Sequence, residues 1–455
     1  MKKLICLILA LITAFAFTAC NNKNKGDSTS TGDAPQTVNL NLDKNTEAEI
    51  TILIPGGNSN EETMIDALIE DFALMYPRVK IDYNYVTVNS YDSQIRNLAS
   101  TGTLDDIVWS NSPDFYYLVN KNLVYNLNPY IEASEEAGVF NLEEDFHSEF
   151  FDMGSIGGNL YCVPRSADSV VTFINTDIFE KAGVDMSLVK NGWTWDTFLS
   201  VCETIRQYFD STGKGSSYVL DANLTSWLSV CYPMLCSYGA DVIDENGNII
   251  IDSAATKKCL EMVRYMVEKR YIVDSQEASG SSFEAGTSAM LFQSASFSLF
   301  AERMALKNKI DLVSFPLITE NNTPKIGCGI AGYCINKNTK YADVCWAFLN
   351  YMLSYDGQQK MANNGLNLAS IRKDLADPTT ANWGIKYPGI NMSSYLYGSE
   401  YKLDTAFLSR LDPSMKPDFT TALKDMFNSA CNATKDIDAA IDQCVEDMEY
   451  ALDEY

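Results

Sequence analysis

Few residues in this sequence could support catalysis by histidine or by a bound metal. The 455-residue chain contains one histidine, His147, so a cluster of histidine ligands cannot form. A Ser-His-Asp triad would need His147, but its acidic surroundings, NLEEDFHSEF (141–150), favour an exposed helix face. The segment PGGNSN (55–60) contains neither of the glycine patterns that hold nucleotide phosphates. We therefore expect no metal and no cofactor.

Carboxylates are the one abundant chemical group. The chain has 60 Asp and Glu against 34 Lys and Arg, a formal charge of −26. A pair of carboxylates could hydrolyse a glycosidic bond, but no pair stands out among so many, and a surface-anchored glycoside hydrolase stays open as an alternative. So acidic a surface argues against nucleic acid and against anionic lipid as partners.

The order of elements indicates an α/β protein. EITILI (49–54) reads as a buried strand, the stretch after it as a helix ended by Pro77, and VKIDYNYV (79–86) as an alternating strand. A helix through Ile95 and the strand LDDIVWS (104–110) follow, which is the pattern of a parallel sheet with covering helices. Later segments repeat it, with Thr194 predicted as a helix cap and Asn246-Gly247 as a hairpin turn. A chain of this length is expected to form two domains or lobes.

The N-terminus has the features of an export signal. Lys2 and Lys3 precede an apolar core from Leu4 to Phe17 that is too short to span a membrane stably. The small residues before Cys20 resemble the lipobox of bacterial lipoproteins, in which the cysteine is acylated and becomes the mature N-terminus. An ordinary signal peptide cut near Ala19 is the alternative. The polar stretch 21–36 has no large apolar residue and should be a flexible tether.

Ten further cysteines follow Cys20, and no C-x-x-C motif occurs among them. Several lie within apolar patterns, where a free cysteine behaves as a small hydrophobic residue. We expect mostly unpaired, buried thiols.

Seven segments in order, from about 49 to 357, resemble the sugar-binding branch of the extracellular solute-binding proteins of ATP-binding cassette (ABC) transporters, which includes maltose-binding proteins. They are EITILIPGG, TGTLDDIVWS, NLVYNLNPYI, GNLYCVPRSADSVVTFINTDIFEKAG, WTWDTF, FEAGTSAMLF and GYCINKNTKYADVCWAFLNYMLS. Two details depart from the family pattern, since Cys345 replaces an alanine and Phe297 stands where tryptophan is common.

The resemblance implies two doubly wound lobes joined by a hinge that the chain crosses more than once. It implies a signal peptide over 1–19, a lipidated cysteine and tether over 20–47, a first lobe from 48–165 plus 327–371, and a second lobe from 166–326 plus 372–455. The crossings are expected near Arg165 and Tyr333, where Gly327, Gly329 and Gly332 can absorb backbone rotation.

In such sheets ligands bind beyond the carboxyl ends of the strands. The first strand then delivers Asn58, and the third delivers Trp109, Ser110 and Asn111. The resemblance adds candidates from the crossings and the second lobe, namely Arg165, Trp227, Ser296, Phe297 and Tyr333. Trp109 and Trp227 could instead be core residues, and Arg165 could pair with an acidic neighbour.

The sequence therefore predicts a non-enzymatic, monomeric receptor on the outer face of the cell membrane, held there only by its lipid anchor. It would bind a carbohydrate between its lobes and pass it to an ABC permease. The same receptor binding a polyamine or a peptide is the other alternative.

Overall fold

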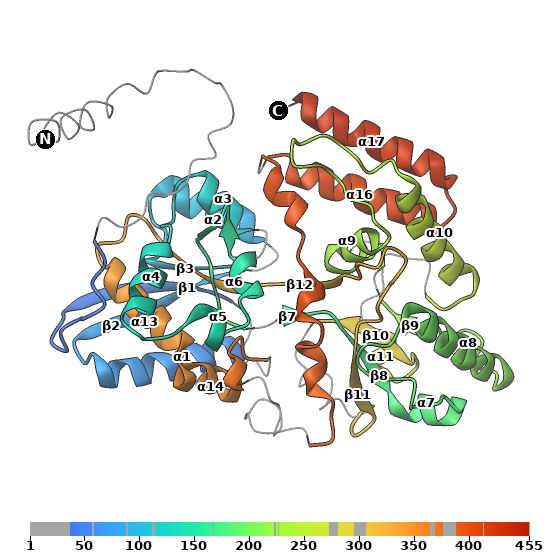
Figure 1. The fold of residues 1–455 in the computed structure, drawn as a ribbon, viewed down its shortest axis with the longest axis horizontal. Helices are drawn as coiled ribbons and strands as arrows, with labels where there is room; N and C mark the ends of the chain where they lie inside the picture. Colours follow the sequence, from blue (N-terminus) through green and yellow to red (C-terminus); the bar gives the residue numbers. More distant parts are fainter. Residues whose placement is uncertain are drawn as a thin grey trace, which may run out of the picture.

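The computed structural model describes residues 37–56, 59–87, 90–111, 114–166, 168–222, 224–225, 227–272, 281–294, 306–364, 369–375, 388–412 and 414–454. These residues form two α/β lobes that lie side by side, each built around its own sheet (Figure 1). A small third sheet lies between them. The predicted fold class, two doubly wound lobes joined by a hinge, is confirmed.

The first lobe has a five-stranded mixed sheet in the order β2-β1-β3-β13-β6. Strands β1 (Ala48–Pro55), β2 (Val79–Val86) and β3 (Ile107–Asn111) are parallel, as the alternation of strands and helices predicts. Strand β13 (Ala331–Ile335) returns from the second lobe and pairs antiparallel with β3, and β6 (Val163–Pro164) pairs antiparallel with β13.

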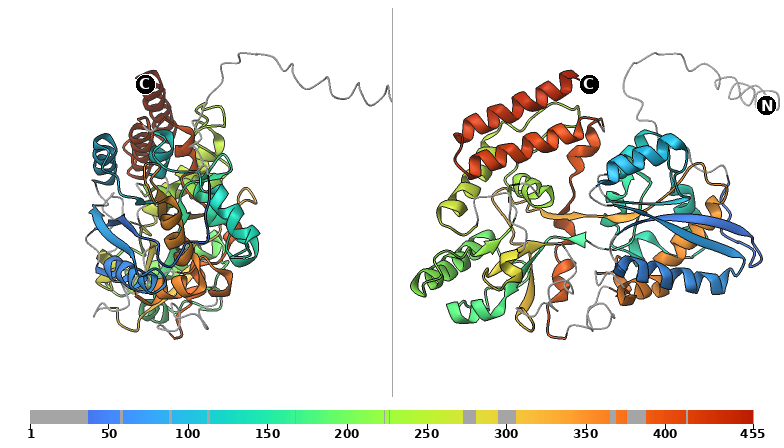
Figure 2. Two further views of the ribbon diagram at one scale, coloured as in Figure 1. Left: turned by 90° about the vertical axis from the view of Figure 1, so that its left-hand side faces the viewer. Right: turned by 180° about the vertical axis from the view of Figure 1, so that it is seen from behind.

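Helices cover both faces of this sheet. Figure 1 shows α1 and α14 below it and α2 and α3 above it, and the reverse view in Figure 2 agrees. The first lobe contains α1 (Ser59–Met75), α2 (Tyr91–Thr101), α3 (Phe115–Asn120), α4 (Asn128–Glu136), α5 (Leu142–Asp145), α6 (Glu149–Met153), α13 (Ala342–Leu353), α14 (Tyr355–Asn364), the 3-10 turn η2 (Lys373–Leu375) and the short hairpin β4 (Ser155–Ile156) and β5 (Asn159–Leu160).

The second lobe has a four-stranded sheet in the order β11-β8-β10-β9. Strand β8 (Val171–Asn175) is antiparallel to both β10 (Met290–Gln293) and β11 (Ile310–Ser314), and β10 is parallel to β9 (Leu220–Asp221). Side chains of β8 such as Val171 and Phe173 join the core cluster of the first lobe, whereas Ile174 joins the second cluster. The two faces of this sheet therefore serve two different cores.

The other helices of the described residues belong to the second lobe. They are α7 (Thr176–Ala182), α8 (Trp195–Ser211), α9 (Leu228–Ser237), α10 (Ala254–Glu268), α11 (Ser281–Glu284), the 3-10 turns η3 (Met392–Tyr395), η4 (Ser399–Tyr401) and η5 (Ala406–Arg410), and the C-terminal pair α16 (Lys416–Cys431) and α17 (Ile437–Glu454). The pair α16 and α17 packs together next to α10, at the end of the molecule marked C in Figure 1.

Local signals explain several boundaries. The Thr194 side chain accepts a hydrogen bond from the N–H of Thr197 and so caps α8 as predicted. Gly102 and Gly183 end α2 and α7 in the left-handed conformation that glycine adopts without strain. Gly247 has a positive φ of 82° between the paired residues Ile243 and Ile249, which confirms the hairpin turn.

Three short strands connect the lobes. In this connecting sheet, β12 (Ile326–Gly329) pairs antiparallel with β7 (Asp168–Ser169) and parallel with β14 (Lys402–Leu403). Residues 165 and 166 lead from β6 to β7, and Ile330 alone separates β12 from β13. The chain thus passes between the lobes next to Arg165 and just before Tyr333 (Figure 1).

Within the residues that the structure describes, no helix combines the length and the apolar character that crossing a membrane requires.

Candidate functional site

Strands β3 and β13 place most of the first-lobe candidates together. Tyr333 lies directly opposite Trp109, and Ala331 lies opposite Asn111. Opposed residues of an antiparallel pair, and residues two apart on one strand, point to the same face of a sheet. Trp109, Asn111 and Tyr333 therefore share one face at the end of β3 that lies toward the connecting sheet.

Trp109 is 4% exposed and belongs to the first-lobe core. Its ring packs edge-on against Tyr91, with ring centroids 5.6 Å apart, and the Tyr91 hydroxyl donates to the Trp109 carbonyl at 3.0 Å. The same hydroxyl lies 2.9 Å from Oγ of Ser110, which is fully buried. The indole Nε1 of Trp109 has no hydrogen-bond partner in the described part of the chain, nor has Oδ1 of Asn111. Trp109 is therefore a core residue whose indole N–H has no acceptor among the described residues.

Arg165 forms a buried ion pair with Glu61, a residue in the first turn of α1. The Tyr333 hydroxyl lies 3.5 Å from the same carboxylate oxygen, Oε1 of Glu61. Burial works against the charge on Arg165, but Glu61 and Tyr333 outweigh it, so the pKa of Arg165 is raised. The structure thus shows the pairing with an acidic neighbour that the sequence left open. Nε of Arg165 still has no partner among the described residues.

Second-lobe candidates lie beside the connecting sheet. Trp227 is half-buried, precedes α9 and packs against the second core. The start of α9 meets β12 so closely that a Cβ on Gly327 would lie 1.6 Å from the carbonyl oxygen of Ser229. Oγ1 of the buried Thr225 has no partner in the described chain. The predicted residues Asn58, Ser296, Phe297 and Cys20 lie outside the described residues.

Three residues of this region were not predicted from the sequence. Glu61 and Tyr91 lie at the starts of α1 and α2, just after the loops that follow β1 and β2. Ser166 follows Arg165 at the crossing, and its buried hydroxyl has no partner among the described residues. Glu61 could have been suspected, because an acidic residue in the first turn of a helix after a sheet strand lies near the ligand end of such folds.

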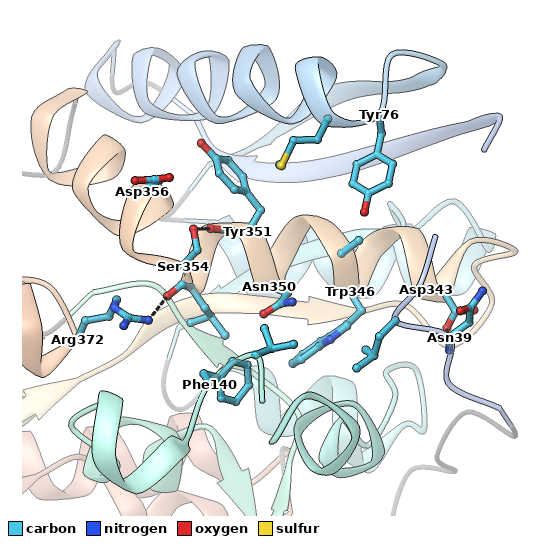
Figure 3. A pocket seen from close by; sticks show the side chains of 15 residues that line it. Asn39, Tyr76, Phe140, Asp343, Trp346, Asn350, Tyr351, Ser354, Asp356 and Arg372 are labelled. Atoms are coloured by element: carbon cyan, nitrogen blue, oxygen red, sulfur yellow. Dashed lines mark hydrogen bonds between the residues drawn. The ribbon is translucent and has the colours of Figure 1, made fainter. Parts of the chain in front are cut away.

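A separate pocket of about 360 Å³ lies within the first lobe (Figure 3). Its floor is one stripe of α13, including Trp346 and Asn350, and its walls are Tyr76 after α1 and Phe140 after α4. The segment around Asn39 closes one end. None of the predicted ligand-binding residues lines this pocket.

The described residues contain no group of three side chains of the types His, Cys, Asp and Glu that could hold a metal. His147 is half-buried outside any helix, and its Nδ1 lies 3.5 Å from Oε1 of Glu149. The exposed helix face expected for His147 was therefore wrong, since the chain turns there to start α6. Cys162, Cys202 and Cys334 are free and buried, as expected.

The relatives found by sequence and by structure are named as binding proteins for sugars or other transported substrates. The chain is 24% identical over 347 residues to the arabinooligosaccharide-binding protein of Bacillus subtilis, covering 73% of this chain and 75% of that one. The cyclic alpha-maltosyl-1,6-maltose binding protein from Arthrobacter globiformis has a similar structure, with a TM-score of 0.72, 16% identity and coverage of 90% and 100%. A Listeria monocytogenes ABC substrate-binding protein in complex with cycloalternan gives 0.70 and 16%, covering 90% of this chain and 99% of that one.

The family model described as bacterial extracellular solute-binding protein matches residues 67–389. This match includes β3, the crossings on both sides of the connecting sheet and most of the second lobe. The expectation of a binding protein is confirmed: the chain belongs to the bacterial extracellular solute-binding proteins and is a receptor, not an enzyme.

Proposed function

We propose that this protein is a lipid-anchored receptor that binds a carbohydrate between its two lobes and delivers it to an ABC permease. The observation that carries this proposal is a group of buried polar atoms without partners in the described chain, at the point where the lobes meet. They are Trp109 Nε1, Asn111 Oδ1 and Arg165 Nε of the first lobe, Ser166 Oγ at the crossing, and Thr225 Oγ1 of the second lobe.

Buried donors and acceptors without partners are costly, about 1–3 kcal/mol each, so native proteins rarely keep them. A ligand rich in hydroxyl groups could satisfy them in one step. The ring of Trp227, which is half-buried, would suit the C–H surface of a sugar, while Trp109 would offer its Nε1–H. The curated relative from Bacillus subtilis is named for arabino-oligosaccharides, which makes short neutral saccharides the first ligands to test.

In this proposal the two lobes comprise 48–165 plus 327–371 and 166–326 plus 372–455, except that η2 (Lys373–Leu375) packs on α5 and α14 and so belongs to the first lobe. Asn58 and Trp109 of the first lobe would approach Trp227 and Phe297 of the second only when the lobes close. A ligand that touches both lobes binds the closed state better, and this difference in affinity is what shifts the population.

Calorimetry of the purified protein against arabino-oligosaccharides, malto-oligosaccharides, a polyamine and a short peptide tests the ligand class. We expect a saccharide to bind and, at saturation, to reduce the radius of gyration in X-ray scattering. Binding of the polyamine or peptide alone would overturn the carbohydrate assignment. Steady hydrolysis of an oligosaccharide would overturn the receptor, and an unchanged radius would overturn closure.

The anchor has its own test. We propose that residues 1–19 are removed, that Cys20 is acylated, and that residues 20–47 link it to β1, with the last part of this segment packed on the first lobe through Val38, Leu40 and Leu42. In the natural cell, the protein should fractionate with membranes, and its N-terminal peptide should carry the mass of acyl chains. The Cys20→Ala variant should lose both properties. Membrane attachment that survives this substitution would exclude the lipid anchor.

A further inference from the structure

One carboxylate oxygen connects the start of α1 to two neighbouring strands of the first-lobe sheet, β6 and β13, at which the chain leaves this lobe and returns to it. Oε1 of Glu61 accepts a charged hydrogen bond from Arg165 Nη1, and the Tyr333 hydroxyl lies 3.5 Å away. Arg165 directly follows β6, where the chain leaves the first lobe, and Tyr333 lies in β13, where it returns. Glu61, in turn, follows the β1–α1 loop that contains Asn58.

The backbone of Arg165 is held as firmly as its side chain. Its N–H donates to the carbonyl of Ala331 at 3.0 Å, which ties the two crossing strands together. Its carbonyl accepts a hydrogen bond from Nε2 of Gln358 at 3.0 Å, and Oε1 of Gln358 accepts one from Ser370 at 2.7 Å. Ser370 lies on the segment of the first lobe that precedes the last return to the second. Arg165 therefore contacts three elements of the first lobe, namely α1, β13 and α14.

Stability alone is a weak reason for such a pair. Glu61 and Arg165 are 1% and 6% exposed, and the cost of removing two charges from water commonly offsets their attraction. Replacing both partners by apolar residues of similar size is often neutral or stabilising. An apolar pair would pack without a fixed orientation. The charged pair, by contrast, holds the Arg165 guanidinium in one position relative to α1 and Tyr333, because its hydrogen bonds are directional.

We propose that Glu61 and Arg165 are positioning residues that fix where the two crossing strands leave the first lobe and thereby set the resting angle between the lobes. This inference rests on the proposed function, since it concerns how the interlobe site is prepared for its ligand. Without the pair, the ligand-free protein would sample a different range of lobe arrangements. Part of the binding free energy would then be used to restore the binding arrangement.

The central variant is the double substitution Glu61→Leu with Arg165→Met, which leaves no unpaired buried charge. Arg206→Met is the matched control, because Arg206 is equally buried and paired with Asp210 but lies on α8, away from the crossings. Circular dichroism should show that both variants fold. We expect the double variant to bind the saccharide roughly 5- to 150-fold more weakly, the usual range for coupled sites. The control should bind within about twofold of wild type.

Scattering without ligand distinguishes positioning from direct contact with the sugar. We expect the radius of gyration of the ligand-free double variant to differ from wild type, while that of Arg206→Met does not. Weaker binding with an unchanged ligand-free radius would overturn positioning and make Arg165 a contact residue. Wild-type affinity in the double variant would also overturn it.

Two further results distinguish a failure of the positioning role from a failure of the proposed function. If the double variant does not fold, Tyr333→Phe removes only one hydroxyl of the same cluster and should still shift the ligand-free radius. No shift would overturn positioning. If wild-type protein binds no saccharide at all, the proposed ligand class fails, but the comparison of ligand-free radii still tests Glu61 and Arg165.

Discussion

Tyr333 faces Trp109 across the antiparallel pairing of β13 with β3, two residue pairs away from the Ala331–Asn111 pair that ends this ladder. The strand that returns from the second lobe is thus paired with the strand that presents the principal aromatic candidate. A rotation at Ile330 would take place directly beside the end of the ladder that carries Asn111 and Trp109. The candidate ligand site and the hinge are parts of one structure.

Trp109 should separate packing from recognition. Trp109→Ala should destabilise the protein by about 3–5 kcal/mol, because a buried aromatic residue leaves a large cavity. Trp109→Phe keeps most of the packing against Tyr91 and removes only the unpartnered Nε1–H, so it should fold normally and bind the saccharide roughly 2- to 12-fold more weakly. Calorimetry and thermal unfolding give the two values. Unchanged affinity in Trp109→Phe would mean that the residue serves the core alone.

The glycines at the crossing are not equivalent. A Cβ on Gly332 would lie 2.2 Å from the carbonyl oxygen of Val163, whereas one on Gly329 would meet nothing within 4 Å. Gly332→Ala should therefore cost about 1–3 kcal/mol through overpacking of the β13–β6 pair, and Gly329→Ala should be nearly neutral. Denaturant unfolding compares them. Equal stability of the two variants would show that the strands separate more easily than this contact implies.

Asp105 provides a test of pH dependence. Burial raises the pKa of this carboxyl above its ordinary value of 3.8, although hydrogen bonds from Asn84 and Thr51 offset part of the effect. The folded state then holds the proton more tightly than the unfolded state, so stability falls as the pH rises through this window and stays lower at neutral pH.

Asp105→Asn removes the buried charge and should therefore raise the melting temperature at pH 7. At about pH 3 the gain should vanish, because Asp105 is then protonated in both states. A gain of equal size at both pH values would show that its cause is not the charge.

The buried thiols should be unreactive until the protein unfolds. Burial raises the pKa of Cys231 and of Cys444 to about 12, so almost no thiolate forms at pH 8. Iodoacetamide at pH 8 should leave both residues unmodified in the native protein and alkylate them in guanidinium without a reductant. Mass spectrometry of the peptides reads the result. Resistance in the unfolded protein would reveal disulfides and contradict the free thiols seen here.

Elements with a strong local signal could be predicted from the sequence. Strand β2 ends where the alternation of VKIDYNYV ends, and α1 stops before Pro77 because the ring cannot continue a helix. Thr194 and Gly247 were assigned correctly because a cap and a tight turn depend on neighbouring residues only. The ordered family motifs added the fold of the whole chain.

Contacts between distant segments could not be predicted in this way. Glu61 and Arg165 are 104 positions apart, and nothing in either local pattern selects the other from 60 acidic and 34 basic residues. The antiparallel entry of β13 between β3 and β6 depends on the path of the whole second lobe. His147 was misjudged because its acidic neighbours indicate charge but not the turn that half-buries its ring.

The segment before β1 is fastened to the first lobe: Val38, Leu40 and Leu42 pack against its core, and the N–H of Asn39 donates to Asp343 at 3.2 Å. In the proposed receptor, the tether to the membrane is therefore attached to the first lobe only. That lobe keeps a fixed distance range from the bilayer, and α16 and α17 are carried by the other. Relative to the membrane, opening and closing would then move mainly the second lobe. A permease would therefore meet one surface whose position does not depend on the ligand, and a second surface whose position does.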